Sequence, residues 1–293
     1  MAQVITSATH KGGEGKTTLS ISIAEYLAII KNKKVLLIDL DPQVNLSSRY
    51  LKMDVDPNKT AGRMPPIHPD SEDEIEERSS IADLFFGKPV YPYPTRFKNI
   101  EIIPGSVELE EIRASFDNSK WKKVSSTLKN FLEIEELDKE YDFVVIDTPP
   151  SKCPLTRSAI SCTDFLIFPT KMEKFSMDGI YGMMQLYSIE KSERSESNPI
   201  NLLGIVPNMF RKTKLHEENL QLLMSHNPLA RHVLPHKLKL RSKYPELLNE
   251  NAEPSSVFEL SSKDAVRKET EDLCSACYDR INSFVNKEQG VEV

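Results

Sequence analysis

A glycine-rich segment near the N-terminus contains the residue types that hold phosphate groups. Residues 11–18 read Lys-Gly-Gly-Glu-Gly-Lys-Thr-Thr, between an apolar stretch and a segment of helical periodicity. Glycines let the main chain turn tightly with its amide groups directed inward, and the N-terminus of a following helix favours negative charge. Lys16 can reach the β- and γ-phosphates of a nucleotide, and the Thr17 hydroxyl can ligate magnesium. The candidate phosphate-binding residues of this loop are Lys11, Gly12, Gly13, Gly15, Lys16, Thr17 and Thr18.

Three aspartates lie at the ends of apolar runs farther along the chain. Asp39 and Asp41 end the run KKVLLIDLD, and Asp147 ends the run YDFVVID. Acidic strand ends agree with a phosphate loop, because carboxylate oxygens are ligands that Mg²⁺ prefers. For Asp39 and Asp41 the alternative is a polar strand terminus with no role in metal binding or catalysis.

Apolar runs alternate with helical segments along most of the chain. The expected strands are residues 3–8, 33–39, 99–105, 141–150, 163–170 and 201–208. Continuous apolar runs of this length are typical of parallel strands buried on both faces, and residues 177–192 have the spacing of an intervening helix. The alternation predicts an α/β fold with a doubly wound, mostly parallel sheet flanked by helices, in a single domain over residues 1–293.

One segment interrupts this alternation. Residues 53–78 contain four prolines and eight acidic residues against three basic ones, a net charge of −5. This composition predicts an acidic, proline-rich and mobile surface insertion. The segment is either a contact site for another protein or a solvated loop.

Composition excludes several classes of protein. The chain of 293 residues is 39% hydrophobic and 28% charged with a net charge of −6, as in soluble globular proteins. No apolar run approaches about 18 residues, and the N-terminal residues lack the pattern of a signal peptide, so we expect a cytoplasmic protein. The four cysteines are too few for a disulfide framework. Cys274 and Cys277 have the spacing of a metal-binding pair, but without a second pair or a nearby histidine core packing is favoured.

The phosphate loop departs from the usual pattern, which has a glycine five residues before the Gly-Lys pair. This chain has His10 at that position, followed by Lys11. The sequence K-G-G-x-G-K-T-T resembles the deviant Walker A motif of the ParA/MinD family of ATPases. Three later stretches resemble that family in the same order: LLIDLDPQVNLSS, YDFVVIDTPPS, and GIVPNMFRKTKL with VLPHKLKLR. The resemblance covers nearly the whole chain except residues 53–78.

The resemblance implies a mechanism and a set of roles. In this family two ATP-bound subunits close face to face, and the first lysine of the loop, here Lys11, reaches the nucleotide of the other subunit. A cation in that position stabilises the transition state of phosphoryl transfer. Asp41 would orient or deprotonate the attacking water, Thr17 and Asp147 would hold Mg²⁺, and Asp39 would support the metal site.

Further positions are assigned by the resemblance or depart from it. Asn208 and Pro235 fall where family members contact adenine. Glu14 puts an acid into the phosphate loop, so its side chain must point away from the phosphates or weaken their binding. Val44 replaces a family glycine. Lys152 is an unusual cation after the third motif, either a second lysine for the phosphates or the dimer contact, or a plain surface lysine.

A basic stretch on this acidic protein suggests a partner. Residues 209–243 contain eight basic residues and two acidic ones, a net charge of +6. The candidate DNA-binding residues are Arg211, Lys212, Lys237, Lys239, Arg241 and Lys243. Such a stripe can hold the phosphates of double-stranded DNA without reading sequence, as ParA-like proteins do on the nucleoid. The alternative is a solvated basic face.

Two classes of function follow from the resemblance. The first is a positioning ATPase that binds nucleoid DNA as a dimer and is stimulated by an adaptor protein on a plasmid, a chromosome region or a carboxysome. The second is a metabolic or metal-cluster-assembly ATPase. The C-terminal residues 279–293 are poor in bulky apolar groups, so membrane attachment of the MinD kind is not expected. The absence of a segment before the first strand disfavours a helix-turn-helix DNA reader.

Overall fold

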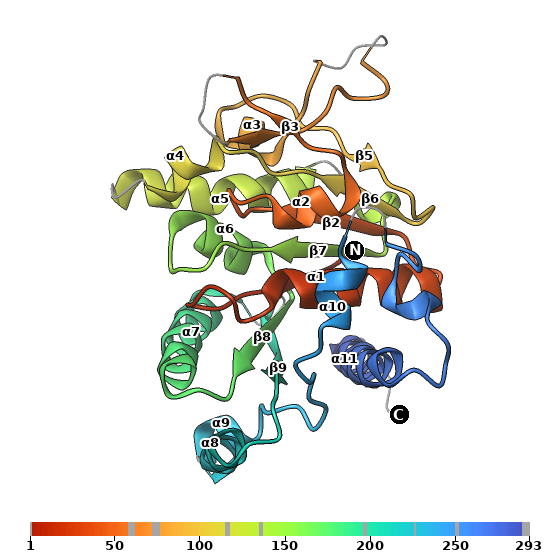
Figure 1. Cartoon of the computed structure of the whole chain (residues 1–293). Helices are drawn as coiled ribbons and strands as arrows, with labels where there is room; N and C mark the ends of the chain where they lie inside the picture. Colours follow the sequence, from red (N-terminus) through yellow and green to blue (C-terminus); the bar gives the residue numbers. More distant parts are fainter. Residues whose placement is uncertain are drawn as a thin grey trace.

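A seven-stranded sheet forms the centre of the protein (Figure 1). The computed structural model describes residues 2–57, 62–71, 77–114, 118–134, 137–195, 198–225, 227–249 and 252–288. The strand order is β5-β6-β2-β7-β1-β8-β9, and all neighbouring pairs are parallel except β5 with β6. The strands are β1 (Gln3–Ser7), β2 (Val35–Asp39), β5 (Tyr93–Pro94), β6 (Ile100–Ile103), β7 (Phe143–Asp147), β8 (Phe165–Lys171) and β9 (Asn201–Asn208).

Helices cover both faces of the sheet, with α6 and α7 at the left and α11 at the right of Figure 1. The longer helices are α1 (Lys16–Glu25), α5 (Asn118–Ile134), α6 (Pro154–Cys162), α7 (Lys174–Glu193), α8 (Lys214–Ser225) and α11 (Ala265–Glu288). The shorter ones are α2 (Asn45–Tyr50), α3 (Ile81–Phe85), α4 (Leu109–Arg113), α9 (Asn227–Ala230) and α10 (Lys243–Leu247). Single turns occur at Tyr26–Ile30, Leu137–Lys139 and Val257–Glu259.

The strands are apolar on both faces because both faces are packed. In β2, Leu37 lies in the cluster that contains residues of α1 and α11, whereas Leu36 and Ile38 lie in the cluster that contains residues of α4 and α6. Successive side chains of a strand point to opposite faces, so one continuous apolar run supplies both layers. The prediction of a doubly wound, mostly parallel sheet is confirmed.

Two features of the sheet region differ from the expectation. The edge strand β5 runs antiparallel to β6 and is not among the expected strands. Only Tyr93 and Pro94 pair with β6, and two residues are too few to show a strand pattern. In the acidic segment 53–78, β3 (Asp54–Val55) and β4 (Arg63–Met64) form an antiparallel pair. Residues 58–61 and 72–76 of that segment lie outside the described residues, so the expected mobility stays a prediction.

The described part of the acidic segment is attached to the rest of the fold. Arg78 forms an ion pair with Asp54 at 2.7 Å. His68 is buried and packs edge-on against the Tyr93 ring at 4.4 Å between centroids. The Tyr93 hydroxyl donates to the carbonyl of Pro66 at 3.0 Å. The hairpin is therefore anchored to the edge strand β5.

The two cysteines of the C-x-x-C pair are core residues. Cys274 and Cys277 lie on α11, each 2% exposed, in the cluster that contains residues of α1. The Cys274 thiol lies 3.6 Å from the carbonyl of Ser22, and burial raises the pKa of both thiols. The core-packing interpretation is confirmed. Over the part of the chain that the structure describes, no helix has the length and apolar character needed to cross a membrane.

Candidate active site

The glycine-rich loop leads directly from β1 into α1. Gly13 and Gly15 have φ angles of 72° and 90°, the left-handed region that side chains disfavour. A Cβ at Gly15 would also overlap the Asn208 amide nitrogen. Lys16 begins α1 and is 6% exposed. The segment therefore has the expected order of strand, loop and helix, and the N-terminus of α1 lies at the loop.

Thr17 and Asp147 meet at the start of α1. The Thr17 hydroxyl donates to Asp147 Oδ2 at 2.6 Å, and the Ser20 hydroxyl lies 3.3 Å from Asp147 Oδ1. Asp147 is fully buried, and this burial raises its pKa to about 6 although the Thr17 hydrogen bond and the Lys16 charge oppose the shift. The carboxylate and the hydroxyl offer oxygen ligands of the kind that Mg²⁺ takes.

Asp39 lies beside this pair but its oxygens are already used. Its Oδ1 accepts from the backbone N–H of Asp41 at 3.1 Å, and its Oδ2 accepts from the N–H and the hydroxyl of Ser47 at 2.8 and 2.7 Å. Burial and then the Asp147 charge raise the pKa of Asp39 to about 8. The structure therefore brings Asp39 to the site as an anchor for Asp41 and α2, and its part in the metal site stays a prediction.

Asp41 lies close enough to Lys16 of the loop for the lysine charge to act on its carboxylate. Its Oδ1 accepts from the N–H of Gln43 at 3.0 Å, and the residue is 7% exposed. Burial raises the pKa of Asp41, while the Gln43 hydrogen bond and the Lys16 charge act in the opposite direction. A raised pKa makes this carboxylate a stronger base than an exposed aspartate, as a group that accepts a proton from water requires.

Glu14 points away from the interior of the loop, which is the first of the two expected alternatives. Its Oε2 accepts from the backbone N–H of Lys171 at 2.6 Å, and its Oε1 accepts from the Ser176 hydroxyl at 2.8 Å. The Glu14 carbonyl accepts from Asn208 Nδ2 at 2.7 Å. The Glu14 carboxylate therefore attaches the loop to the end of β8 and to the first turn of α7. The Glu14 carbonyl attaches it to the end of β9.

Two residues with predicted adenine contacts lie beyond the loop. The amide of Asn208 is used within the protein, because it donates to the Glu14 carbonyl and accepts from the N–H of Met209 at 2.8 Å. Pro235 is exposed, directly after Leu234, whose N–H donates to Ile205. In this structure Asn208 positions the loop, and its adenine contact stays a prediction.

The remaining loop residues lie at the surface of the site. Lys11 is partly buried, and its carbonyl accepts from the Thr9 hydroxyl at 2.9 Å. Gly12 faces Pro150, and the carbonyl of Thr18 accepts from the Ser22 hydroxyl at 2.8 Å.

Lys152 lies against α7. A Cβ at Gly182 would be 2.8 Å from both Cε and Nζ of Lys152, so the side chain crosses the helix where glycine leaves room. One turn earlier, Gly179 similarly faces His10 of the loop. The structure therefore places the Lys152 ammonium on α7, and a contact with phosphate or a second subunit stays a prediction.

The six candidate DNA-binding residues of the basic stretch separate into two groups. Lys239 and Arg241 both form 2.6 Å ion pairs with Glu269 of α11, and Lys243 pairs with Asp264 at 2.6 Å. The other group is Arg211, Lys212 and Lys237, all exposed. The Lys237 ammonium lies 4.2 Å from the centroid of the Phe210 ring. The charge count along the sequence did not include Glu269, which lies on α11, or Asp264, which precedes that helix.

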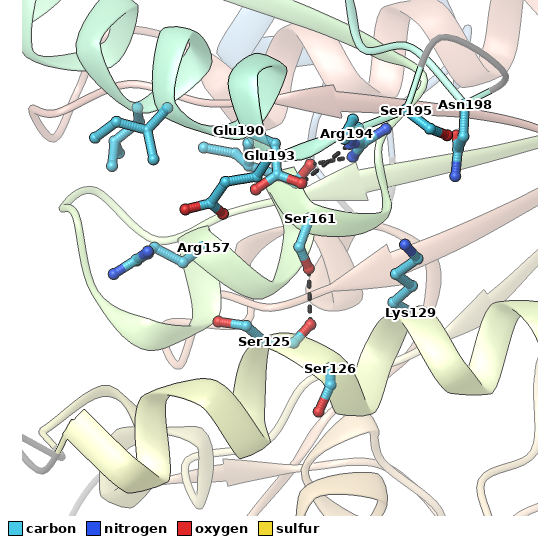
Figure 2. A pocket seen from close by; sticks show the side chains of 13 residues that line it. Ser125, Ser126, Lys129, Arg157, Ser161, Glu190, Glu193, Arg194, Ser195 and Asn198 are labelled. Atoms are coloured by element: carbon cyan, nitrogen blue, oxygen red, sulfur yellow. Dashed lines mark hydrogen bonds and ion pairs between the residues drawn. The ribbon is translucent and has the colours of Figure 1, made fainter.

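A second concave surface lies away from the loop. A cleft of about 910 Å³ is bordered by α5, α6 and α7 and includes Lys129, Arg157 and Asn198. Figure 2 shows that the Ser161 hydroxyl donates a hydrogen bond to the carbonyl of Ser125, which joins α6 to α5. No residue of the phosphate loop lines this cleft. Among the described residues no group of three or more His, Cys, Asp or Glu is placed to hold a metal ion.

Comparison with known proteins agrees with this geometry. The family model described as an AAA domain matches residues 2–201, more than half of the chain. The ParA family protein pGP5-D of the Chlamydia psittaci virulence plasmid is 34% identical over 200 residues, which cover 68% of this chain and 66% of that protein. The structure of apo McdA from Cyanothece matches with a TM-score of 0.71 and 20% identity, covering 94% of this chain and 99% of that one. A protein of Borrelia burgdorferi assigned to plasmid partition and bound to AMPPNP matches with a TM-score of 0.69 and 20% identity over 96% of this chain and 100% of that one.

Proposed function

Since the chain belongs to the ParA/MinD family of P-loop ATPases, we propose that it binds Mg-ATP, closes into a homodimer around two nucleotides and reopens after slow hydrolysis. The observation that carries this proposal is the convergence of Lys16, Thr17, Asp41 and Asp147 beside the phosphate loop. Each has the charge or the oxygen atoms that phosphoryl transfer requires.

Thr17 and Asp147 fit a magnesium site. Both are oxygen donors, they lie 2.6 Å apart, and Asp147 is fully buried. Burying a carboxylate is unfavourable unless a cation or hydrogen-bond donors compensate, and a divalent cation compensates most strongly. When bound, Mg²⁺ neutralises charge on the β- and γ-phosphates. Asp39 supports the site indirectly by holding Asp41 and Ser47.

Asp41 is the proposed base for hydrolysis. Its second oxygen, Oδ2, accepts no hydrogen bond within the described residues, while Oδ1 is held by Gln43. The carboxylate is therefore oriented and can orient an attacking water or accept its proton. Lys11 is proposed to extend toward the nucleotide of the second subunit, where its charge stabilises the phosphoryl group as hydrolysis proceeds.

The partners are proposed from the family and from the basic surface. The ATP-bound dimer would bind double-stranded DNA of the nucleoid without sequence preference, and the protein would be cytoplasmic and nucleoid-associated. A cargo-adaptor protein would stimulate hydrolysis, with a plasmid, a chromosome region or a carboxysome as cargo. Relatives named for chromosome partitioning, Soj of Thermus thermophilus and ParA of Caulobacter vibrioides, support partition as the general role. The buried positions of Cys274 and Cys277 speak against metal-cluster assembly.

A direct test is ATP hydrolysis by the purified protein. We expect slow, Mg²⁺-dependent release of phosphate that is lost when Lys16 is replaced by Ala, whereas Lys34→Ala, an exposed lysine before β2, keeps the wild-type rate. Hydrolysis that persists unchanged in Lys16→Ala would contradict the proposal, because it would place the reaction elsewhere.

A further inference from the structure

Lys171 is a cation at the phosphate loop that the motifs do not include. It is the last residue of β8 and is partly buried. A Cβ built on Gly13 would lie 3.7 Å from Lys171 Nζ, and no other heavy atom of the described residues outside residues 12–14 comes within 4 Å of it. The ammonium therefore lies over the loop at a residue whose amide belongs to the phosphate-binding motif.

The position of Lys171 is fixed through its main chain. Its backbone N–H donates to Glu14 Oε2 at 2.6 Å, and it pairs in register with Asn208 of β9, whose amide holds the Glu14 carbonyl. Glu14, Lys171 and Asn208 thus join the loop to two strand ends. Because the main chain makes these bonds, the Lys171 side chain can be changed while the attachment remains.

The charge of Lys171 is not balanced within the described residues, where its ammonium has neither an ion pair nor a hydrogen-bond acceptor. The nearest acid in the sequence motif, Glu14, uses both carboxylate oxygens on the backbone N–H of Lys171 and on Ser176. A partly buried ammonium that has no anion beside it is poorly stabilised. An anion that binds at the adjacent phosphate loop would therefore interact favourably with it.

We infer that Lys171 contacts the phosphate chain of the bound nucleotide, as a phosphate-binding lysine in addition to Lys11 and Lys16. This inference rests on the proposed function, because it assigns a further residue to the same site. Glu14 is then a positioning residue, since it holds the end of β8 that carries Lys171 against Gly13. A charge-assisted hydrogen bond to phosphate is among the stronger polar contacts in proteins.

The test compares equilibrium binding of ATP with Mg²⁺ by wild-type protein, Lys171→Gln, Lys171→Arg and the control Lys174→Gln, an exposed lysine three residues later. Lys171→Gln should raise the Kd for ATP about tenfold at low salt. Lys171→Arg should restore the affinity to within about threefold, because it restores the charge. Lys174→Gln should stay within about twofold, and the Tm of all four proteins without nucleotide should agree.

Three outcomes would overturn the inference while leaving the proposed function intact. They are an unchanged Kd in Lys171→Gln, an equal loss in Lys174→Gln, or a loss in Lys171→Gln that Lys171→Arg does not restore. A wild-type protein that binds no ATP would instead overturn the proposed function itself. The two failures are therefore distinguishable in one set of titrations.

Discussion

Thr17 Oγ1 and Asp147 Oδ2 are joined by a 2.6 Å hydrogen bond across 130 residues of sequence. The bond connects the first turn of α1 to the end of β7, so the phosphate loop and the third motif form one site. Both atoms are magnesium ligands by type. The hydrogen bond therefore holds the two ligands together before any cation binds.

Asp147→Asn should remove most of the benefit of Mg²⁺. Asparagine can still accept from Thr17 but carries no charge for the cation. In wild type, Mg²⁺ should increase the affinity for ATP. In the variant we expect this increase to be at least about tenfold smaller. Asp142→Asn is the matched control, because Asp142 directly precedes the same strand but pairs with Lys33 at the surface. Equal magnesium dependence in Asp147→Asn and wild type would exclude Asp147 as a ligand.

The pKa of Asp147 predicts a pH dependence of magnesium binding. Burial raises this pKa to about 6, and Mg²⁺ binds the ionised carboxylate. Protonation below about pH 6 therefore competes with the cation, so the magnesium-dependent part of ATP affinity should fall as the pH is lowered from 7 to 5. Titrations at several pH values measure this fall. In Asp147→Asn the same part should depend less steeply on pH, because only the nucleotide phosphate still titrates over this interval. A slope equal to that of wild type would assign the titration to another group than Asp147.

Asp41→Asn should separate binding from hydrolysis. The side chain keeps an oxygen for the Gln43 N–H but loses its basicity. We expect kcat to fall by about 10²- to 10⁴-fold, the usual contribution of a general base, while the Kd for ATP stays within about threefold. Phosphate release and nucleotide titration check the two parts. A variant that hydrolyses ATP at the wild-type rate would exclude Asp41 as the base.

The proposed DNA surface is best tested at the exposed cations. Replacing Arg211, Lys212 and Lys237 by Gln should weaken ATP-dependent retention of double-stranded DNA and lower the slope of log K against log salt by about 0.9 for each lost phosphate contact. Charge reversal at Lys239 or Arg241 is a poorer test, because it would place like charges against Glu269. Lys34→Gln is a control at an exposed position. An unchanged salt slope in the triple variant would move the DNA contact away from this surface.

Local patterns predicted the fold and the loop well. The apolar runs of β1, β2, β6, β7, β8 and β9 are contiguous, and burial on both faces requires them to be apolar. The phosphate loop is also contiguous, so its glycines and Lys16 stand out in the sequence. The two-residue strand β5 has too little sequence to show a periodicity.

Relationships between distant residues could not be predicted in the same way. Spacing alone does not show that Asp39 accepts hydrogen bonds from Ser47, on α2, and from the Asp41 backbone N–H. Lys171 reaches Gly13 only because β8 lies next to β1 in the sheet. The basic stretch meets Glu269 only through the packing of α11. These contacts depend on the tertiary arrangement, which single-sequence spacing does not contain.

The central claim is that Lys11 acts on the nucleotide of the opposite subunit. The most direct measurement is ATP hydrolysis by an equal mixture of Lys11→Ala and Asp41→Asn proteins, each inactive alone. A mixed dimer has one site with an intact Asp41 and a Lys11 from the other subunit, so the mixture should recover roughly a quarter of wild-type activity by random pairing. A mixture that stays as inactive as its components, under conditions where wild-type protein hydrolyses ATP, would contradict the account.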